Sequence, residues 1–217
     1  MNDIEFDNHL DDFIKRWGGC HLNSIGIFLR LPDENLNQRD FTVTKSRSFV
    51  FDDDDQKEIE QCGRGDIVIV PVAIVIQLVK KLDRHGNVTK DFIINHKNTL
   101  VVDKKSKTIY RFEPHVTMYT SDVRIDNLLK RRFRNLNFRY VSTTNLCFAG
   151  PQNRQNSSDT CAYWCLYFLE LLLSGEDIQE IIKYLCNIKS KEAKAIMDDY
   201  KLILHNNNRK IKKYESR

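Results

Sequence analysis

Residues 96–115 read HKNTLVVDKKSKTIYRFEPH, and this stretch predicts the β-hairpin around which the chain folds. Residues 99–102 and 108–113 are rich in β-branched and aromatic side chains, as strands are. A polar turn at residues 104–107 separates them, and Pro114 ends the second strand. The two strands are therefore expected to pair in antiparallel fashion.

The register of this hairpin brings a histidine and a carboxylate close together. The turn sets Asp103 opposite Thr108. Continued pairing sets Asn98 opposite Glu113 and makes His96 the diagonal neighbour of Glu113 on the same face. A carboxylate within reach of an imidazole fixes its tautomer and stabilises the imidazolium, which a histidine base needs in order to activate a thiol. We predict His96 as general base and Glu113 as the acid that orients it.

A second stretch, CAYWCLYFLELLL at residues 161–173, predicts a long apolar helix. The preceding residues 157–160, SSDT, are typical of helix N-caps, so Cys161 is expected in the first turn. There the unpaired N–H groups and the positive end of the helix dipole stabilise a thiolate and lower the pKa of the thiol. Cys161 is the candidate nucleophile; the alternative is a buried structural residue like Cys165.

The loop predicted at residues 150–159 supplies two candidates for an oxyanion hole, Gln152 and Gln155. A glutamine side-chain N–H beside the backbone N–H of the nucleophile would stabilise a tetrahedral intermediate. The residue type and the position in the loop do not choose between them.

In their order along the chain, these residues resemble the cysteine proteases that include the adenovirus protease and the ubiquitin-like-protein (SUMO) proteases. That order is histidine, then Asp, Asn or Glu, then glutamine, then cysteine at a helix start. The hairpin, Gly150-Pro151-Gln152 and Cys161-Ala162-Tyr163-Trp164 are similar to the versions in large DNA viruses. The resemblance covers residues 93–175. Within it, the Gly-Pro-Gln match favours Gln152, whereas the spacing to the cysteine in SUMO proteases favours Gln155.

The resemblance implies an α+β fold of the papain-like or adenain-like kind. Its mixed central sheet would pack on the helix that begins at Cys161, and helices would flank both ends of the chain. It also implies a thiol protease without a cofactor, which acts on a protein substrate. That substrate is expected to be a viral polyprotein, or alternatively ubiquitin or SUMO conjugates of the host.

Length and composition predict one domain, because 217 residues with 41% apolar side chains bury a single core of ordinary size. Its parts are expected to be a variable substrate-facing region at 1–90, a catalytic core at 91–175, helices at 176–205 and a basic tail at 206–217. The net charge of +4 is too mild to indicate a nucleic-acid partner by itself.

The expected location is the cytoplasm, or a virion. The N-terminus lacks the pattern of a secretory signal, and the apolar run at 67–79 is shorter than the roughly 20 residues of a membrane span. The six cysteines show no C-x-x-C pair, so we expect free thiols in a reducing compartment. Cysteine and histidine do not cluster at fixed offsets, so we expect no metal site.

The remaining periodicity predicts further elements along the chain. They are a helix at 4–17 closed by Gly18-Gly19, strands at 24–31 and 41–51, an acidic loop at 52–55, a hairpin of 66–79 with 91–95, a helix at 121–133, a strand at 138–141, and helices at 177–187 and 190–204.

Two other classes of function compete with the protease. One is an acyltransferase with a His-Glu-Cys arrangement, for which the sequence has no evident coenzyme A site. The other is a non-catalytic module that holds nucleic acid through the basic runs at 130–134 and 209–213. Such runs are more often solvated helix faces, and these lack interleaved aromatic side chains for base stacking.

Overall fold

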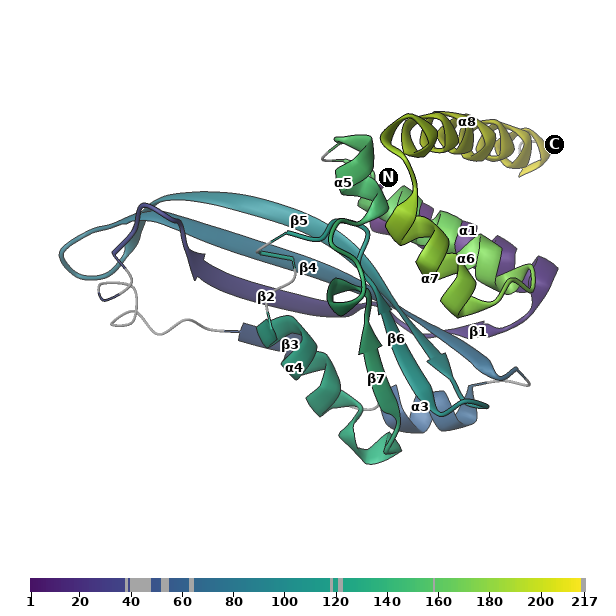
Figure 1. Cartoon of the computed structure of the whole chain (residues 1–217), viewed down its shortest axis with the longest axis horizontal. Helices are drawn as coiled ribbons and strands as arrows, with labels where there is room; N and C mark the ends of the chain where they lie inside the picture. The colour runs from purple at the N-terminus through teal and green to yellow at the C-terminus, as the bar shows by residue number, and fades with distance from the viewer. Residues whose placement is uncertain are drawn as a thin grey trace. The chain divides into compact units, whose positions relative to one another are not determined.

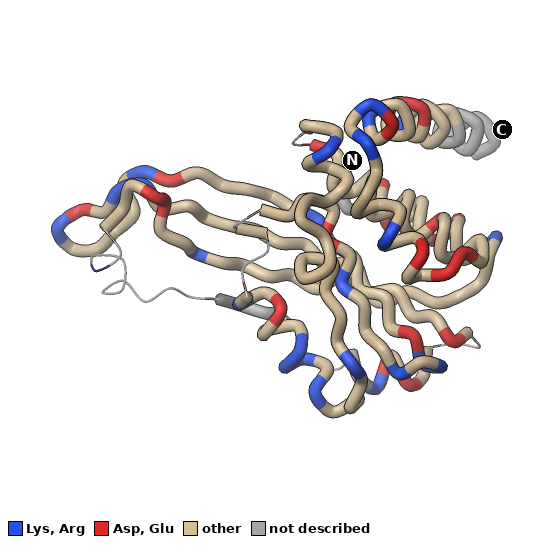
Figure 2. The backbone as a smooth tube through the Cα atoms, in the orientation of Figure 1, with Lys and Arg blue, Asp and Glu red and all other residues tan. Residues whose placement is uncertain are grey.

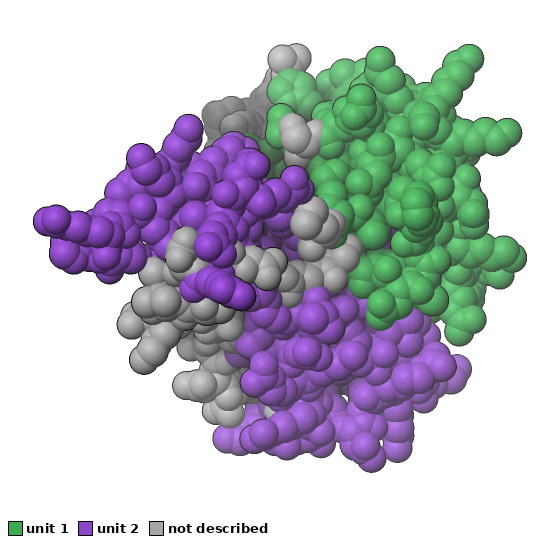
Figure 3. All heavy atoms as spheres, turned by 60° about the vertical axis from the view of Figure 1, so that its left-hand side comes forward, with its two compact units in different colours: residues 1–18, 113–117, 143–217 green, residues 19–112, 118–142 purple. Residues whose placement is uncertain are grey.

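The computed structural model describes residues 1–37, 39, 48–51, 55–62, 65–117, 119–120, 123–157 and 159–215 (Figure 1). The chain divides into two compact units, each built from separate segments of sequence (Figure 3). Unit 1 comprises Met1–Gly18, Glu113–Thr117 and Thr143–Arg217, and unit 2 comprises Gly19–Phe112 and Met118–Ser142. The expectation of a single domain with four consecutive parts stays a prediction.

Unit 2 is built on a seven-stranded mixed sheet in the order β3-β2-β4-β5-β6-β7, with β1 paired to β4. Together with the helices of unit 1 this sheet makes the chain α+β, as predicted. The β2–β4 and β6–β7 pairs are parallel, whereas β2–β3, β4–β5 and β5–β6 are antiparallel. The strands are β1 Cys20–His21, β2 Ile25–Pro32, β3 Ser48–Phe51, β4 Ile67–Leu82, β5 Val88–Asp103, β6 Thr108–Phe112 and β7 Arg139–Ser142.

The predicted hairpin register is confirmed, because Asp103 pairs with Thr108. The strands around it are longer than expected. The sequence predicts residues 96–98 between two strands, but they lie inside β5, where His96 pairs with Ile74 of β4 and Asn98 with Val72. The continuous ladder with β4 supplies the hydrogen bonds that keep this polar stretch extended. The β5–β6 ladder ends at Thr99 and Phe112, one residue before Glu113.

One face of the sheet in unit 2 forms an apolar core with the short helices α3 (Asp55–Gln61) and α4 (Val123–Arg132). Because side chains alternate along a strand, His96 and Asn98 lie on the same face of β5 as the core residues Leu100 and Val102. The prediction of a strand at 41–51 is confirmed only for β3. Its first part, and residues 52–54 of the predicted acidic loop, lie outside the described residues.

A fully buried arginine, Arg111 of β6, crosses this core face. Its Nε donates to Asn98 Oδ1 at 2.9 Å, its Nη1 to Asp126 Oδ1 at 3.0 Å, and its Nη2 to the Thr120 carbonyl oxygen at 2.7 Å. The Tyr140 hydroxyl donates to the same Asp126 oxygen at 2.7 Å, and burial raises the pKa of Tyr140. This network ties β5, β6, α4 and β7 together next to the strand segment that carries His96.

Unit 1 is helical. Its helices are α1 Asp3–Trp17, η2 Thr143–Asn145, α5 Pro151–Gln155, α6 Cys161–Leu173, α7 Ile178–Asn187 and α8 Ser190–Glu215. The boundaries predicted for the helix at 161–173 are those observed. The predicted N-terminal helix is also present, capped by Asn2 and ended by Gly18 at φ +90°.

Two predictions about unit 1 are wrong. The loop expected at 150–159 contains the short helix α5, which Pro151 opens at the first helical position. The helix expected to end at residue 204 continues to Glu215, through most of the tail expected to fray.

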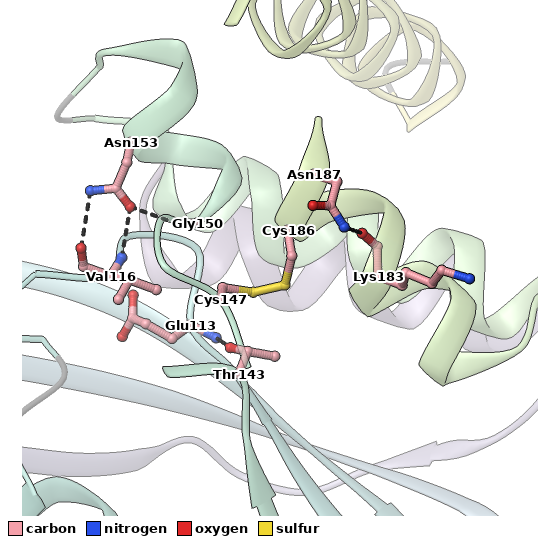
Figure 4. Close-up of a disulfide and its surroundings, with 9 residues drawn as sticks. All are labelled: Glu113, Val116, Thr143, Cys147, Gly150, Asn153, Lys183, Cys186 and Asn187. Carbon is pink, nitrogen blue, oxygen red and sulfur yellow. Dashed lines mark hydrogen bonds between the residues drawn. A yellow bond between two sulfur atoms is a disulfide. The ribbon is translucent and has the colours of Figure 1, made fainter. Parts of the chain in front are cut away.

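The expectation that all thiols are free is wrong for four of the six cysteines. Cys20 pairs with Cys62 in unit 2, and Cys147 pairs with Cys186 in unit 1 (Figure 4). Their Cα atoms lie 6.1 and 5.2 Å apart, within the range for disulfides, although 42 and 39 residues of sequence separate them. The cysteines therefore do not indicate a reducing compartment.

Removing the Cys147–Cys186 bond is expected to lower the free energy of unfolding by about 2–4 kcal/mol, because the bond restricts a long loop in the unfolded chain. Cys147→Ser and Cys186→Ser should lose the same amount, since each removes the same crosslink. Guanidinium unfolding of both variants and of the oxidised wild type measures it. A variant as stable as the wild type would contradict the bond. A non-reducing peptide map that shows Cys147 and Cys186 as free thiols would contradict it as well.

Candidate catalytic site

Cys161 is the first residue of α6, and its side chain is half-buried. The first intrahelical bond runs from the Trp164 N–H to the Thr160 carbonyl oxygen at 2.9 Å. The N–H groups ahead of that bond point out of the end of the helix at which the thiol lies, as the prediction for a nucleophilic cysteine requires. Cys165, one turn further along α6, is fully buried.

The cap of α6 differs from the expected one. Thr160 occupies the N-cap position, but its side chain makes no capping hydrogen bond. Its hydroxyl instead donates to Gln155 Oε1 at 2.8 Å, and the indole N–H of Trp164 donates to the same oxygen at 2.9 Å. Because an indole nitrogen only donates, Gln155 must present its oxygen to α6. Gln155 thereby anchors the start of α6 to α5.

Gln152 is 1% exposed and is held at both its backbone and its side chain. Its backbone N–H donates to the Pro114 carbonyl oxygen at 2.9 Å, and its Nε2 donates to the Ser157 carbonyl oxygen at 3.0 Å. The second hydrogen on Nε2 is the candidate oxyanion donor. The choice between Gln152 and Gln155 for this role stays a prediction. The two hydrogen bonds that Gln155 Oε1 accepts show that Gln155 has a structural role.

Glu113 is fully buried immediately after β6 (Figure 4). Its backbone N–H donates to Thr143 Oγ1 at 2.8 Å, and its carboxylate Oε1 accepts the His115 N–H at 2.8 Å. A Cβ on Gly150 would overlap the Pro114 carbonyl oxygen, so only glycine allows α5 to begin this close to the segment. The bonds Pro114–Gln152 and Gln155–Thr160 thus link the Glu113 segment to α5, and α5 to the start of α6.

His96 is 7% exposed and lies within β5 of unit 2. The structure therefore places Glu113, Gln152 and Cys161 in unit 1 and His96 in the other unit. The approach of His96 to Cys161 and Glu113, like the packing of the sheet on α6, stays a prediction from the sequence.

Sequence reasoning missed two polar residues beside the candidate site, Asn153 and Arg111. Asn153 bonds Val116 and Gly150, and Arg111 bonds Asn98, two residues from His96. The signal for Asn153 is its third position in a short helix that opens with Gly-Pro. An arginine in an otherwise apolar strand is the signal for Arg111.

A metal site, a membrane span and a nucleic-acid surface each require particular features of the described part of the chain. No group of three or more His, Cys, Asp and Glu side chains gathers there to hold a metal ion. The helices described are too short or too polar to cross a membrane. Figure 2 shows basic residues along the last turn of α4, namely Lys130, Arg131 and Arg132. The side chains of the second basic run, 209–213, lie outside the described residues.

Comparison with known proteins gives matches among solved structures but none elsewhere. No family model and no curated protein matches the chain. The structure is similar to the ASFV pS273R protease, with 12% identity and a TM-score of 0.47 over 91% of this chain and 66% of that one. It is also similar to ChlaDub1 from Chlamydia trachomatis, with 13% identity and a TM-score of 0.36 over 63% of this chain and 61% of that one.

A third match is the Legionella pneumophila effector protein RavZ, solved in complex with human LC3B. It shows 8% identity and a TM-score of 0.33 over 84% of this chain and 53% of RavZ. The chain thus covers 53% to 66% of the length of these three proteins. Likenesses this distant leave the function to be argued from the residues of the site.

Proposed function

We propose that this chain is a cysteine protease in which Cys161 is the nucleophile, His96 the general base and Glu113 the residue that orients His96. The observation that carries the proposal is the place of Cys161, a half-buried thiol at the first residue of an apolar helix. The confirmed hairpin register supports the other two roles, because Phe112, the residue before Glu113, pairs with Thr99, three residues after His96 in β5.

In the proposed reaction the Cys161 thiolate attacks the carbonyl carbon of a peptide or isopeptide bond. The Gln152 Nε2 hydrogen and the Cys161 backbone N–H stabilise the oxyanion of the tetrahedral intermediate. Imidazolium at His96 gives its proton to the leaving amine, and a thioester to Cys161 remains. His96 then takes a proton from water as the water oxygen attacks the thioester carbon. The C–S bond breaks, the acid product leaves, and the Cys161 thiolate and His96 imidazolium are restored.

The substrate class we propose is a viral polyprotein, processed in the host cytoplasm or in the virion. The support is the similarity of the hairpin, the Gly-Pro-Gln segment and the Cys-Ala-x-Trp segment to proteases of large DNA viruses. Lys97 follows His96 where proteases that clamp a Gly-Gly tail often have tryptophan. This difference favours the polyprotein over the alternative, ubiquitin or SUMO conjugates of the host.

Labelling with electrophilic probes tests both the nucleophile and the substrate class. Iodoacetamide is expected to alkylate Cys161 well before Cys165, because the latter is fully buried and has no helix end beside it. Vinyl-sulfone derivatives of ubiquitin and SUMO are expected to react slowly or not at all. Mass spectrometry of the modified peptide identifies the cysteine.

Each outcome has a distinct meaning. Fast labelling of Cys161 by a ubiquitin or SUMO probe would replace the polyprotein by host conjugates as substrate. Alkylation of Cys165 ahead of Cys161 at neutral pH would show that the nucleophile is wrongly assigned.

A further inference from the structure

The side chain of Asn153 joins two segments that carry proposed site residues (Figure 4). Its Oδ1 accepts the Val116 N–H at 2.8 Å, and its Nδ2 donates to the Val116 carbonyl oxygen at 3.2 Å. The same Oδ1 accepts the Gly150 N–H at 2.9 Å. The carboxamide thus offers Val116 the donor and the acceptor that a neighbouring strand would supply.

Asparagine is the residue that fits these three bonds. A carboxamide has an acceptor and a donor on one plane, whereas aspartate lacks the donor and glutamine is one methylene longer. Asn153 is the third residue of α5, from which a side chain returns a bond to the backbone N–H of the N-cap. Gly150 occupies that N-cap and has no side chain of its own. The capping box therefore consists of one bond, in which the Gly150 N–H donates to Asn153 Oδ1.

The segment that Asn153 holds controls the direction of the Glu113 carboxylate. Glu113 Oε1 accepts the His115 N–H, so the carboxylate is oriented by the conformation of residues 113–116. Asn153 fixes the far end of that segment at Val116, and the Gln152 N–H fixes its middle at Pro114. Gln152 precedes Asn153 in the same short helix.

We propose that Asn153 is a positioning residue that holds the Glu113 carboxylate and the Gln152 amide in a fixed relation to each other. The inference rests on the proposed function, because these are the acid that orients the base and the oxyanion donor. Asn153 itself touches neither the thiol nor the reacting bond. Its effect is therefore on the transition state, which Gln152 and the oriented base stabilise, more than on the binding of substrate.

The test is steady-state kinetics of the full chain on the fluorogenic ubiquitin, SUMO or peptide amide that the wild type cleaves fastest. Asn153→Ala is expected to lower kcat on the order of 100-fold, with a change in KM below about threefold. Asn153→Asp keeps the acceptor for Val116 and Gly150 and should recover part of kcat. Asn187→Ala is the matched control, because among the described residues the bond of that amide is to the Lys183 carbonyl oxygen of its own helix.

The possible results separate the inference from the proposed function. A loss of kcat in Asn153→Ala with partial recovery in Asn153→Asp, at unchanged melting temperatures, supports positioning. An unchanged kcat in Asn153→Ala overturns the inference but not the proposed function. So does a decrease in kcat that is equal in Asn153→Ala and Asn153→Asp and matches the decrease in their folded fraction. A wild-type chain that cleaves none of these amides and shows no reactive Cys161 overturns the proposed function, and the inference with it.

Discussion

Cys161→Ala is expected to reduce turnover by on the order of 10⁴-fold or more, because no other group takes the place of the thiolate in forming the acyl-enzyme. Cys165→Ala is the matched control on the same helix. Cys165 is fully buried one turn further along, so its loss should affect stability slightly and leave kcat nearly unchanged. Single-turnover kinetics on a cleavable substrate measure both variants.

The two histidines near the hairpin provide the same kind of comparison for the base. His96→Ala should also abolish turnover, whereas His115→Ala should keep measurable activity, because the alanine variant keeps the backbone N–H that donates to Glu113 Oε1. A comparable loss in both would show that the base is wrongly assigned. A fully active Cys161→Ala would disprove the protease mechanism through this thiol.

Asp126→Asn is expected to lower the free energy of unfolding by about 3–5 kcal/mol, since it leaves the charge of Arg111 buried without its counter-ion. The two side chains are 8% and 0% exposed and lie 3.0 Å apart, so water cannot replace the lost carboxylate. The size and shape of the residue are kept, which removes packing as the cause. Urea unfolding followed by circular dichroism measures the change.

Glu180→Gln is the control for this prediction, because it makes the same chemical change in a surface pair. Glu180 and Lys183 are 69% and 71% exposed and 3.6 Å apart, and such pairs contribute less than about 1 kcal/mol. Equal destabilisation by the two substitutions would mean that the buried network does not stabilise unit 2. Asp126→Asn also removes support from the strand next to His96, so its activity should be compared at temperatures where both proteins are folded.

The helix α6 and the centre of the hairpin were predictable because their signals are local. Thirteen residues of apolar sequence after a polar segment define α6, and the turn at 104–107 fixes the pairing of Asp103 with Thr108. The helix α5 was not predictable from periodicity, since five residues make little more than one turn. The resemblance, in turn, rests on the order of His96, Glu113, Gln152 and Cys161 along the chain.

The sequence by itself determined the position of Cys161 at a helix start and the register of the hairpin, because each depends on residues that are close in the chain, whereas the α+β class followed from the resemblance. Tertiary structure alone decided which cysteines pair, that Gln155 anchors α6, and that Asn153 forms hydrogen bonds with Val116. The two cysteine pairs, Gln155 with Trp164, and Asn153 with Val116 lie 9 to 42 residues apart in sequence. Contacts at that separation form only when packing brings the segments together, so the local pattern of residues does not predict them.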